Sequence, residues 1–222
     1  MTSAAVVYPV LGEPLSQADL AYREIRALIV TLELPPGSLL SEPEIQARLG
    51  LGRTPVREAL RTLAHERLVE VYPRRGMFVA ALDPRDLSAL SEVREQLEPF
   101  AARLAAERRT DEDVEVIDEL IADLDAVAAA PDMHRLIELD QRIHHHIYRC
   151  AHNDFLQSVC EEHYMHALRI WFLALDRVTH LGDAVAEHRD LLLAVRDGDP
   201  ERAADVMSIH VRGFEAEVRR AL

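Results

Sequence analysis

The sequence predicts a mainly α-helical protein, with an N-terminal winged helix-turn-helix followed by an all-α bundle of about six helices. Three observations support this fold class. Between residues 41 and 65, two helical patterns are separated by a short turn that contains glycine. Two β-prone runs, at residues 68–72 and 77–80, then flank a turn with two arginines, which is typical of a hairpin. After residue 82 helix breakers recur and no strand pattern appears.

The chain has 222 residues, enough for two ordinary domains. We expect a flexible tail at residues 1–15, a winged helix-turn-helix domain at residues 16–82 and a helical domain at residues 83–222. Asp83-Pro84 marks the second boundary, because aspartate caps helices and proline suits a first helical position. In outline, the helical domain is predicted to contain helices at residues 83–109, 110–130, 132–151, 153–179, 183–197 and 199–222.

The first two helices have recognisable ends. Ser16 is expected to cap a helix that runs to about residue 31. Ser41 and Glu44 have the spacing of a capping box, in which each side chain bonds the backbone of the other residue. Gly50 follows as the expected helix stop.

The next helix is expected to be the recognition helix of the motif. Thr54 is predicted to cap it, with Pro55 at the first helical position. Arg53 and Arg57 lie four residues apart near its start, where cations can bind base edges or phosphates in the major groove. Thr54 is a further candidate phosphate contact. The alternative is an ordinary solvated helix face.

The predicted wing has a cationic tip. Arg74 and Arg75, beside Gly76, are placed to contact the minor groove or the DNA backbone.

The net charge of −14 argues against a nucleic-acid-binding protein, but its distribution reverses this interpretation. Residues 1–82 contain nine arginines and nine acidic residues, so the whole excess of negative charge lies in the helical domain. A local cationic surface is sufficient for phosphate binding.

Several other residues are assigned no special role. Cys150 and Cys160 have no metal or redox motif around them, so we expect buried free thiols in a reducing cytosol. His145 and His146 follow His144 but point to other faces of the same helix. The sequence has no membrane-length apolar run and no signal-peptide pattern. We therefore expect a cytoplasmic protein without a membrane partner.

The helical domain contains a candidate metal site. Asp140 and His144 share one helical face because they are four residues apart. His188 and His210 lie on two later helices. One carboxylate and three imidazoles that converge in a bundle core suit a borderline divalent metal such as zinc, nickel or manganese. The alternatives are a solvated acidic face, or histidines that are hydrogen-bonded within the core.

The predicted N-terminal domain resembles the GntR family of bacterial transcription regulators. The resemblance covers about residues 21–80. It is carried by Pro35-Pro36-Gly37, Ser41-Glu42, Gly50-Leu51-Gly52-Arg53-Thr54-Pro55-Val56-Arg57-Glu58-Ala59-Leu60 and Pro73-Arg74-Arg75-Gly76-Met77-Phe78-Val79. It implies double-stranded operator DNA as the partner, with Arg53 and Arg57 at DNA-contacting positions. Regulators of this type bind pseudo-palindromic sites, so we expect a homodimer.

The predicted helical domain resembles the FCD ligand-binding domain of the FadR-type subfamily. The similarity rests on Asp140-x-x-x-His144, Asn153, His188 and the run from Gly198-Asp199 to His210, together with residues 87–98. In metal-binding members an aspartate and three histidines hold a divalent cation, and all four positions are filled here. The resemblance also implies that Arg94 pairs with a carboxylate effector. The alternative for Arg94 is a surface pair with Glu98.

The sequence therefore predicts a ligand-responsive transcription regulator, expected to be a repressor, that binds a divalent metal and a small carboxylate effector. One alternative is a DNA-binding regulator whose helical domain only dimerises. The other is a metal-dependent enzyme, which the absence of an evident general-base or nucleophile motif disfavours. We expect no enzymatic activity.

Overall fold

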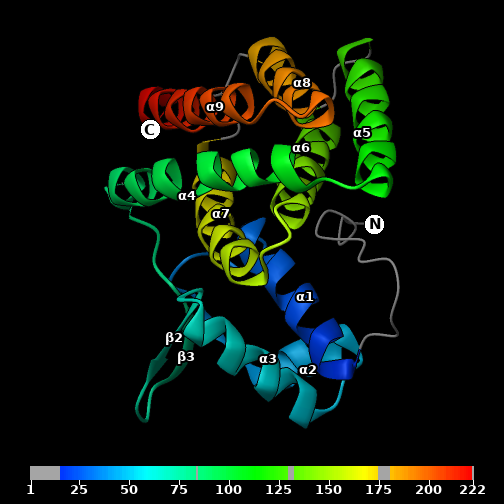
Figure 1. Ribbon diagram of the computed structural model, residues 1–222. Coiled ribbons are helices and arrows are strands. Elements are labelled where there is room, and N and C mark those ends of the chain that lie inside the picture. The colour runs from blue at the N-terminus through cyan, green and yellow to red at the C-terminus, as the bar shows by residue number, and fades with distance from the viewer. Residues whose placement is uncertain (1–15, 84, 130–132, 175–180, 222) are drawn as a thin grey trace. The chain divides into compact units, whose positions relative to one another are not determined.

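The computed structural model describes residues 16–83, 85–129, 133–174 and 181–221 (Figure 1). The expected tail at residues 1–15 lies outside these ranges. The described chain divides into two compact units. One ends at Asp83 and also includes Leu168–Leu173, and the other contains the remaining described residues. No helix among the described residues is long and apolar enough to cross a membrane.

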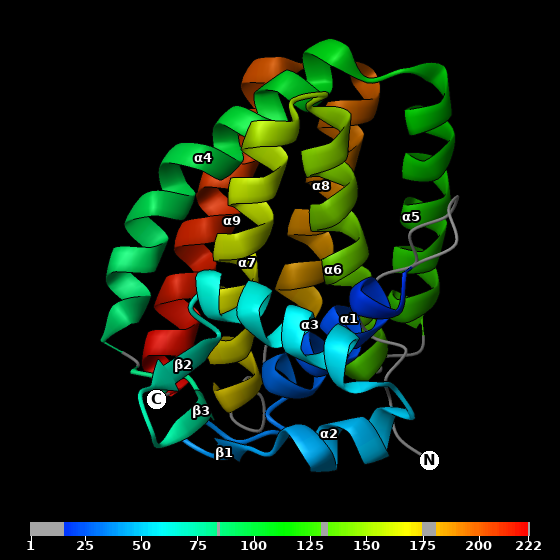
Figure 2. The same ribbon diagram turned by 90° about the horizontal axis from the view of Figure 1, so that it is seen from below.

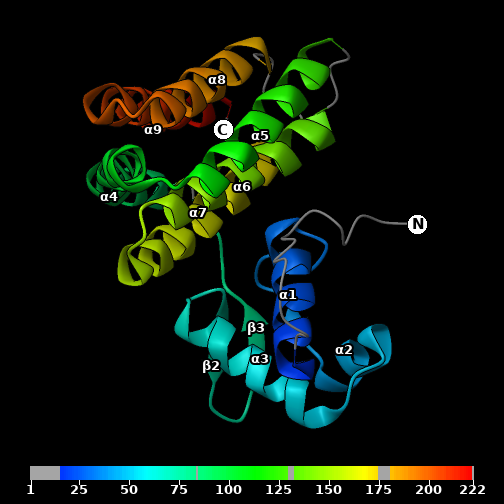
Figure 3. The same ribbon diagram turned by 45° about the vertical axis from the view of Figure 1, so that its right-hand side comes forward.

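The first unit is a winged helix-turn-helix, as predicted (Figure 3). Its apolar core joins α1 to α3, with Ile25, Val56 and Leu60 fully buried. Its elements, in chain order, are α1 (Gln17–Val30), β1 (Leu39–Leu40), α2 (Glu42–Leu49), α3 (Arg53–His65), β2 (Val69–Tyr72) and β3 (Gly76–Val79).

The sheet of this unit has one strand more than the predicted hairpin. Its order is β1-β3-β2, and both pairings are antiparallel. Strand β1 is only two residues long, too short to give an alternating pattern in the sequence. Arg74, in the turn between β2 and β3, and Gly76, at the start of β3, adopt positive φ angles of 64° and 106°. A side chain at position 76 would also lie 3.2 Å from Leu39, so glycine suits this position.

Two of the caps predicted for the first unit are wrong. Ser41 is the N-cap of α2, but its side chain makes no capping hydrogen bond, so the capping box with Glu44 is not formed. Helix α3 begins at Arg53, with the extended backbone of Gly52 as its N-cap. The helix thus starts earlier than predicted, which places Thr54 inside its first turn. By contrast, Ser16 caps α1 and Gly50 ends α2 in a left-handed conformation, as predicted.

The second unit contains the six predicted helices (Figure 2). Helices α4 and α9 pack side by side and run antiparallel. The prediction that Asp83 caps α4 is wrong, because α4 starts at Asp86 with Arg85 as its N-cap, and Pro84 lies outside the described residues. The helices are α4 (Asp86–Arg108), α5 (Asp111–Ala129), α6 (Met133–Cys150), α7 (Asp154–Ala174), α8 (Leu181–Asp197) and α9 (Pro200–Ala221).

Candidate functional site

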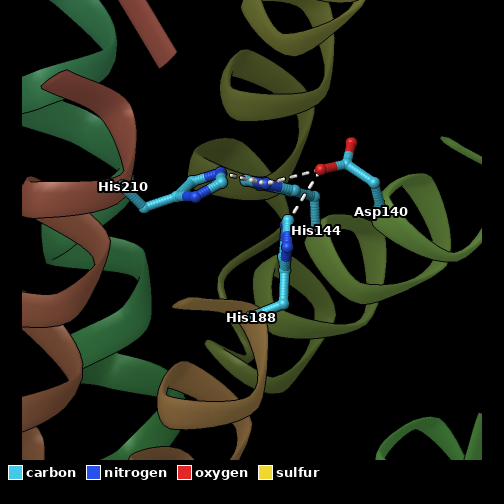
Figure 4. Close-up of side chains that lie close together, drawn as sticks. All are labelled: Asp140, His144, His188 and His210. Atoms are coloured by element: carbon cyan, nitrogen blue, oxygen red, sulfur yellow. Dashed lines mark hydrogen bonds and ion pairs between the residues drawn. The ribbon is translucent and has the colours of Figure 1, made fainter. Parts of the chain in front are cut away.

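The four predicted metal ligands converge in the second unit (Figure 4). Helix α6 supplies Asp140 and His144, α8 supplies His188 and α9 supplies His210. One ligand atom from each lies within 4.8 Å of all the others. All four residues are buried, with His210 the most exposed at 8%. A solvated acidic face, one of the two alternatives, is therefore excluded.

The spacing of the ligand atoms fits a single cation that all four residues share. His144 Nε2 lies 3.2 Å from His210 Nε2, and His188 Nε2 lies 2.9 Å from Asp140 Oδ1. Two nitrogens bound to one tetrahedral ion at 2.0–2.1 Å would be separated by about 3.3 Å. His144 Nε2 lies 3.8 Å from Asp140 Oδ1, so a bound ion would draw these two atoms slightly together.

Hydrogen bonds on the far side of two imidazoles assign their tautomers. His210 Nδ1 lies 3.0 Å from a carboxylate oxygen of Glu187, which only accepts, so this nitrogen carries the hydrogen. His144 Nδ1 lies 3.0 Å from the Tyr148 hydroxyl, whose own hydrogen is donated to Glu98. His144 Nδ1 is therefore also protonated. The two Nε2 atoms consequently direct lone pairs toward each other, an arrangement that a cation between them would satisfy.

The electrostatics of the cluster favour a neutral His144 beside an ionised Asp140. Burial holds the pKa of His144 well below its usual value of 6.5, although Asp140 acts in the opposite direction. For Asp140, burial alone would raise the pKa, but the hydrogen bond from His188 and the adjacent imidazoles lower it overall. Tyr164 also donates a hydrogen bond to Asp140 Oδ2. Neutral nitrogens with one carboxylate oxygen are ligands that borderline divalent metals accept.

Arg94 lies beside this cluster rather than on the surface. It forms an ion pair with Glu98, and both residues are buried, with exposures of 3% and 1%. The i,i+4 pair considered in the sequence therefore exists, but its assignment to the surface is wrong. A Glu98 oxygen also lies 3.5 Å from His144 Nδ1. The ring of Tyr164 stacks on His144, and the Arg94 guanidinium lies 5.9 Å from the centroid of the same ring. Tyr164 therefore lies next to both Arg94 and the cluster.

The predicted DNA-binding residues are exposed and fall into two groups. Arg53, Thr54 and Arg57 lie in the first turns of α3. The second group consists of Arg74 and Arg75 in the turn between β2 and β3, and Gly76 at the start of β3. Glu42 at the start of α2, which the sequence did not single out, accepts hydrogen bonds of 2.9 and 3.0 Å from Arg57 Nε. Its carboxylate lies 3.7 Å from Arg53 Nε, so it holds both arginines at one helix end.

Sequence reasoning missed the residues that orient the metal ligands. Tyr148 could have been found, because it lies four residues after His144 on the same helical face. Glu187 adjoins His188 in the sequence. Tyr164 gives no local signal, since only the packing of α7 brings it to Asp140.

Comparisons with known proteins agree with the two-unit organisation. Residues 17–79 match the family described as bacterial regulatory proteins, gntR family, and residues 89–213 match the FCD domain. An uncharacterized HTH-type transcriptional regulator of Streptomyces ambofaciens is 33% identical, over 90% of this chain and 84% of its own. The galactonate operon transcriptional repressor of Escherichia coli is 33% identical over 78% of this chain and 85% of its own. The solved structure of E. coli McbR/YncC has the same fold, with a TM-score of 0.82, 22% identity and coverage of 93% of this chain and 99% of its own.

Proposed function

Because the chain belongs to the gntR family of bacterial regulatory proteins and carries an FCD domain, we propose that it is a repressor controlled by a small carboxylate that binds beside a metal ion. Its relatives are transcriptional regulators, so the chain is a regulator of transcription and not an enzyme. Three relatives are named as repressors: one is RspR of Escherichia coli, one acts on the galactonate operon, and one, with the qualifier probable, acts on D-xylose utilization. These names support repression here.

In this proposal the first unit binds operator DNA in the cytoplasm. Arg53, Thr54 and Arg57 enter the major groove, and the turn at residues 74–76 contacts the minor groove or backbone. One recognition helix covers a single half-site, so a homodimer binds a pseudo-palindrome. Ligand binding in the second unit changes the population of the DNA-binding arrangement.

The metal assignment depends on one observation above all. His144 and His210 direct the lone pairs of Nε2 at each other across 3.2 Å, and other partners hold their remaining ring nitrogens. A divalent ion held by these two residues with Asp140 and His188 satisfies both lone pairs. Such an ion also supplies positive charge to bind a carboxylate. Zinc, nickel and manganese remain the candidate ions.

Arg94 is proposed to contact the same effector. Its guanidinium group is bound by the buried carboxylate of Glu98, with Arg94 Nη2 3.3 Å from Glu98 Oε2. A carboxylate ligand would compete with Glu98 for this guanidinium, since both present the same pair of acceptor oxygens. Galactonate, which gives one relative its name, is a sugar acid, and this supports sugar acids as the first class to test.

A thermal-shift panel tests the proposal. Sugar acids and their neutral parent sugars are added to full-length protein that has been stripped of metal, and to the same protein with zinc, nickel or manganese restored. We expect an acid to raise the melting temperature only in the presence of metal, and the parent sugar to have no effect. Arg94→Lys keeps the positive charge but cannot bind a carboxylate through two parallel hydrogen bonds, so it should reduce the thermal shift without preventing folding.

Two outcomes would contradict the proposal. Absence of stoichiometric metal in elemental analysis, together with no response to any acid, would favour a helical domain that serves only for dimerisation. A response to neutral sugars of the same size as the response to acids would remove Arg94 from the effector site. Binding of fluorescent operator DNA, with and without the stabilising acid, then measures the sign of regulation.

A further inference from the structure

A second group of metal-binding side chains lies on another face of α6. It consists of Asp113 near the start of α5 and of His146 and Cys150, which are four residues apart on α6. All three are buried, and their ligand atoms lie within 4.8 Å of one another. His144 and His146 are two positions apart, so the helix directs their rings to different sides. The two groups share no residue.

The geometry resembles that of a zinc site. His146 Nε2 lies 3.3 Å from Cys150 Sγ, and a nitrogen and a sulfur bound to one tetrahedral zinc would be separated by about 3.5 Å. A fourth donor lies outside this group, where His152 Nε2 is 2.9 Å from Asp113 Oδ2, so His152 would have to move toward His146 and Cys150 to complete the site. His152 is exposed, so an ion could enter from this side while the other three residues remain buried.

We propose that Asp113, His146 and Cys150, completed by His152, form a second metal site that prefers zinc to harder ions. Both sets contain imidazoles and one carboxylate, but the second has a thiolate in place of one imidazole, and sulfur is a softer ligand than nitrogen, so the two sites differ in preference. The ion would join the start of α5 to the end of α6. Its role is structural, because four protein ligands fill a tetrahedral shell and leave no position for a ligand.

The hydrogen bonds around the group are compatible with the binding of an ion. Asp113 Oδ2 accepts hydrogen bonds from the backbone and hydroxyl of Thr110, so an ion that replaces Arg149 Nη2, now 3.8 Å from Oδ1, could bind Oδ1 without loss of this helix cap. His146 Nε2 lies 3.0 Å from the carbonyl oxygen of Asp113 and carries the hydrogen in the metal-free form. When the ion binds, that hydrogen moves to His146 Nδ1, and the exposed Arg149 guanidinium, now 3.4 Å from this nitrogen, turns outward. The Cys150 thiol releases its proton to solvent as the S–metal bond forms.

Cobalt(II) gives a direct test, because a thiolate bound to Co²⁺ produces a near-ultraviolet charge-transfer absorption that nitrogen and oxygen ligands do not. Metal-free, full-length protein is titrated with Co²⁺ and then with Zn²⁺. We expect the band to appear with cobalt and to disappear when zinc displaces it. Cys150→Ser should abolish the band. Cys160→Ser is the matched control, because Cys160 is equally buried but does not belong to the group.

The test separates the two sites. An Asp140→Ala/His144→Ala variant lacks the first cluster and should keep the thiolate band, so failure of the proposed effector site would leave this result unchanged. If Cys150→Ser does not fold, as judged by circular dichroism, His146→Asn replaces it and should also remove the band. No band in the wild-type protein, or an equal band in folded Cys150→Ser, would overturn the proposal.

Discussion

At the scale of single residues, the positions of a few hydrogens decide what the four-residue cluster can bind. Glu187 and Tyr148 each engage the Nδ1 atom of one histidine and so direct Nε2 inward. Neither residue is a predicted ligand. Their effect is nevertheless large, because an imidazole binds a metal only through a nitrogen that carries no hydrogen. His188 differs in this respect, since its Nε2 would have to give up the hydrogen that it donates to Asp140 before it could bind an ion.

Removal of the Glu187 carboxylate tests this tautomer assignment. Glu187→Gln leaves all four ligands in place but no longer fixes the hydrogen on His210 Nδ1. We expect metal affinity to fall by about 10–100-fold, as measured by competition with a chromophoric chelator. Glu201→Gln is the control, because Glu201 pairs with Arg103 on the surface and its loss changes the net charge equally. Equal affinities in the two variants would contradict the assignment.

The buried neutral His144 predicts a pH dependence of the metal-free protein. Its folded-state pKa is well below 6.5, chiefly because of burial, so at lower pH the unfolded chain binds a proton that the folded chain does not. The free energy of unfolding should therefore be highest above pH 6.5 and fall progressively as the pH drops toward the folded-state pKa. Urea denaturation at a series of pH values measures this slope. His144→Gln should flatten it, and an unchanged slope would assign the effect to other groups.

At the scale of secondary-structure elements, two similar serines have different roles. Ser16 and Asp19 form a full capping box at the start of α1, with Asp19 N–H 3.1 Å from the Ser16 hydroxyl. Ser41 occupies the same position in α2 but makes no such bond. The sequence pattern alone favoured the second site, because Glu44 stands at the usual spacing. Local backbone geometry decided otherwise.

Replacement of the two serines should show this difference. Ser16→Ala is expected to lower the free energy of unfolding by about 1 kcal/mol, because it leaves a helix-terminal N–H without its partner. Ser41→Ala should have a clearly smaller effect. Urea denaturation of both variants measures the comparison. Equal losses would show that Ser41 caps α2 in solution.

At the scale of the whole molecule, charge is segregated between the two units. All of the −14 net charge lies after residue 82, while the arginines of α3 and of the wing are exposed on a first unit of balanced charge. Non-specific attraction to DNA therefore depends on a few local cations. Arg57 and Arg75 should contribute in different ways, because one lies at a recognition-helix start and the other in a hairpin turn.

Binding measurements over a range of salt concentrations separate these roles. Arg57→Ala should cost about 1–3 kcal/mol on an operator selected from random duplexes, and much less on unrelated DNA. Arg75→Ala should weaken both and reduce the slope of log affinity against log salt by about one. Fluorescence anisotropy provides the affinities. A loss for Arg57→Ala that is equal on both DNAs would make it a phosphate contact.

The sequence by itself determined the fold class and the six helices of the second unit, because helical periodicity and breakers are local properties. Spacing placed Asp140 and His144 on one helical face, while the resemblance to the FCD domain implied that His188 and His210 join them, as the structure shows. Only the tertiary structure revealed strand β1, the burial of the Arg94–Glu98 pair, and Tyr164 against Asp140. It also brought Asp113 to His146 and Cys150, which lie more than 30 residues later in the chain. These features depend on contacts between distant segments, and such contacts leave no period or motif in the sequence.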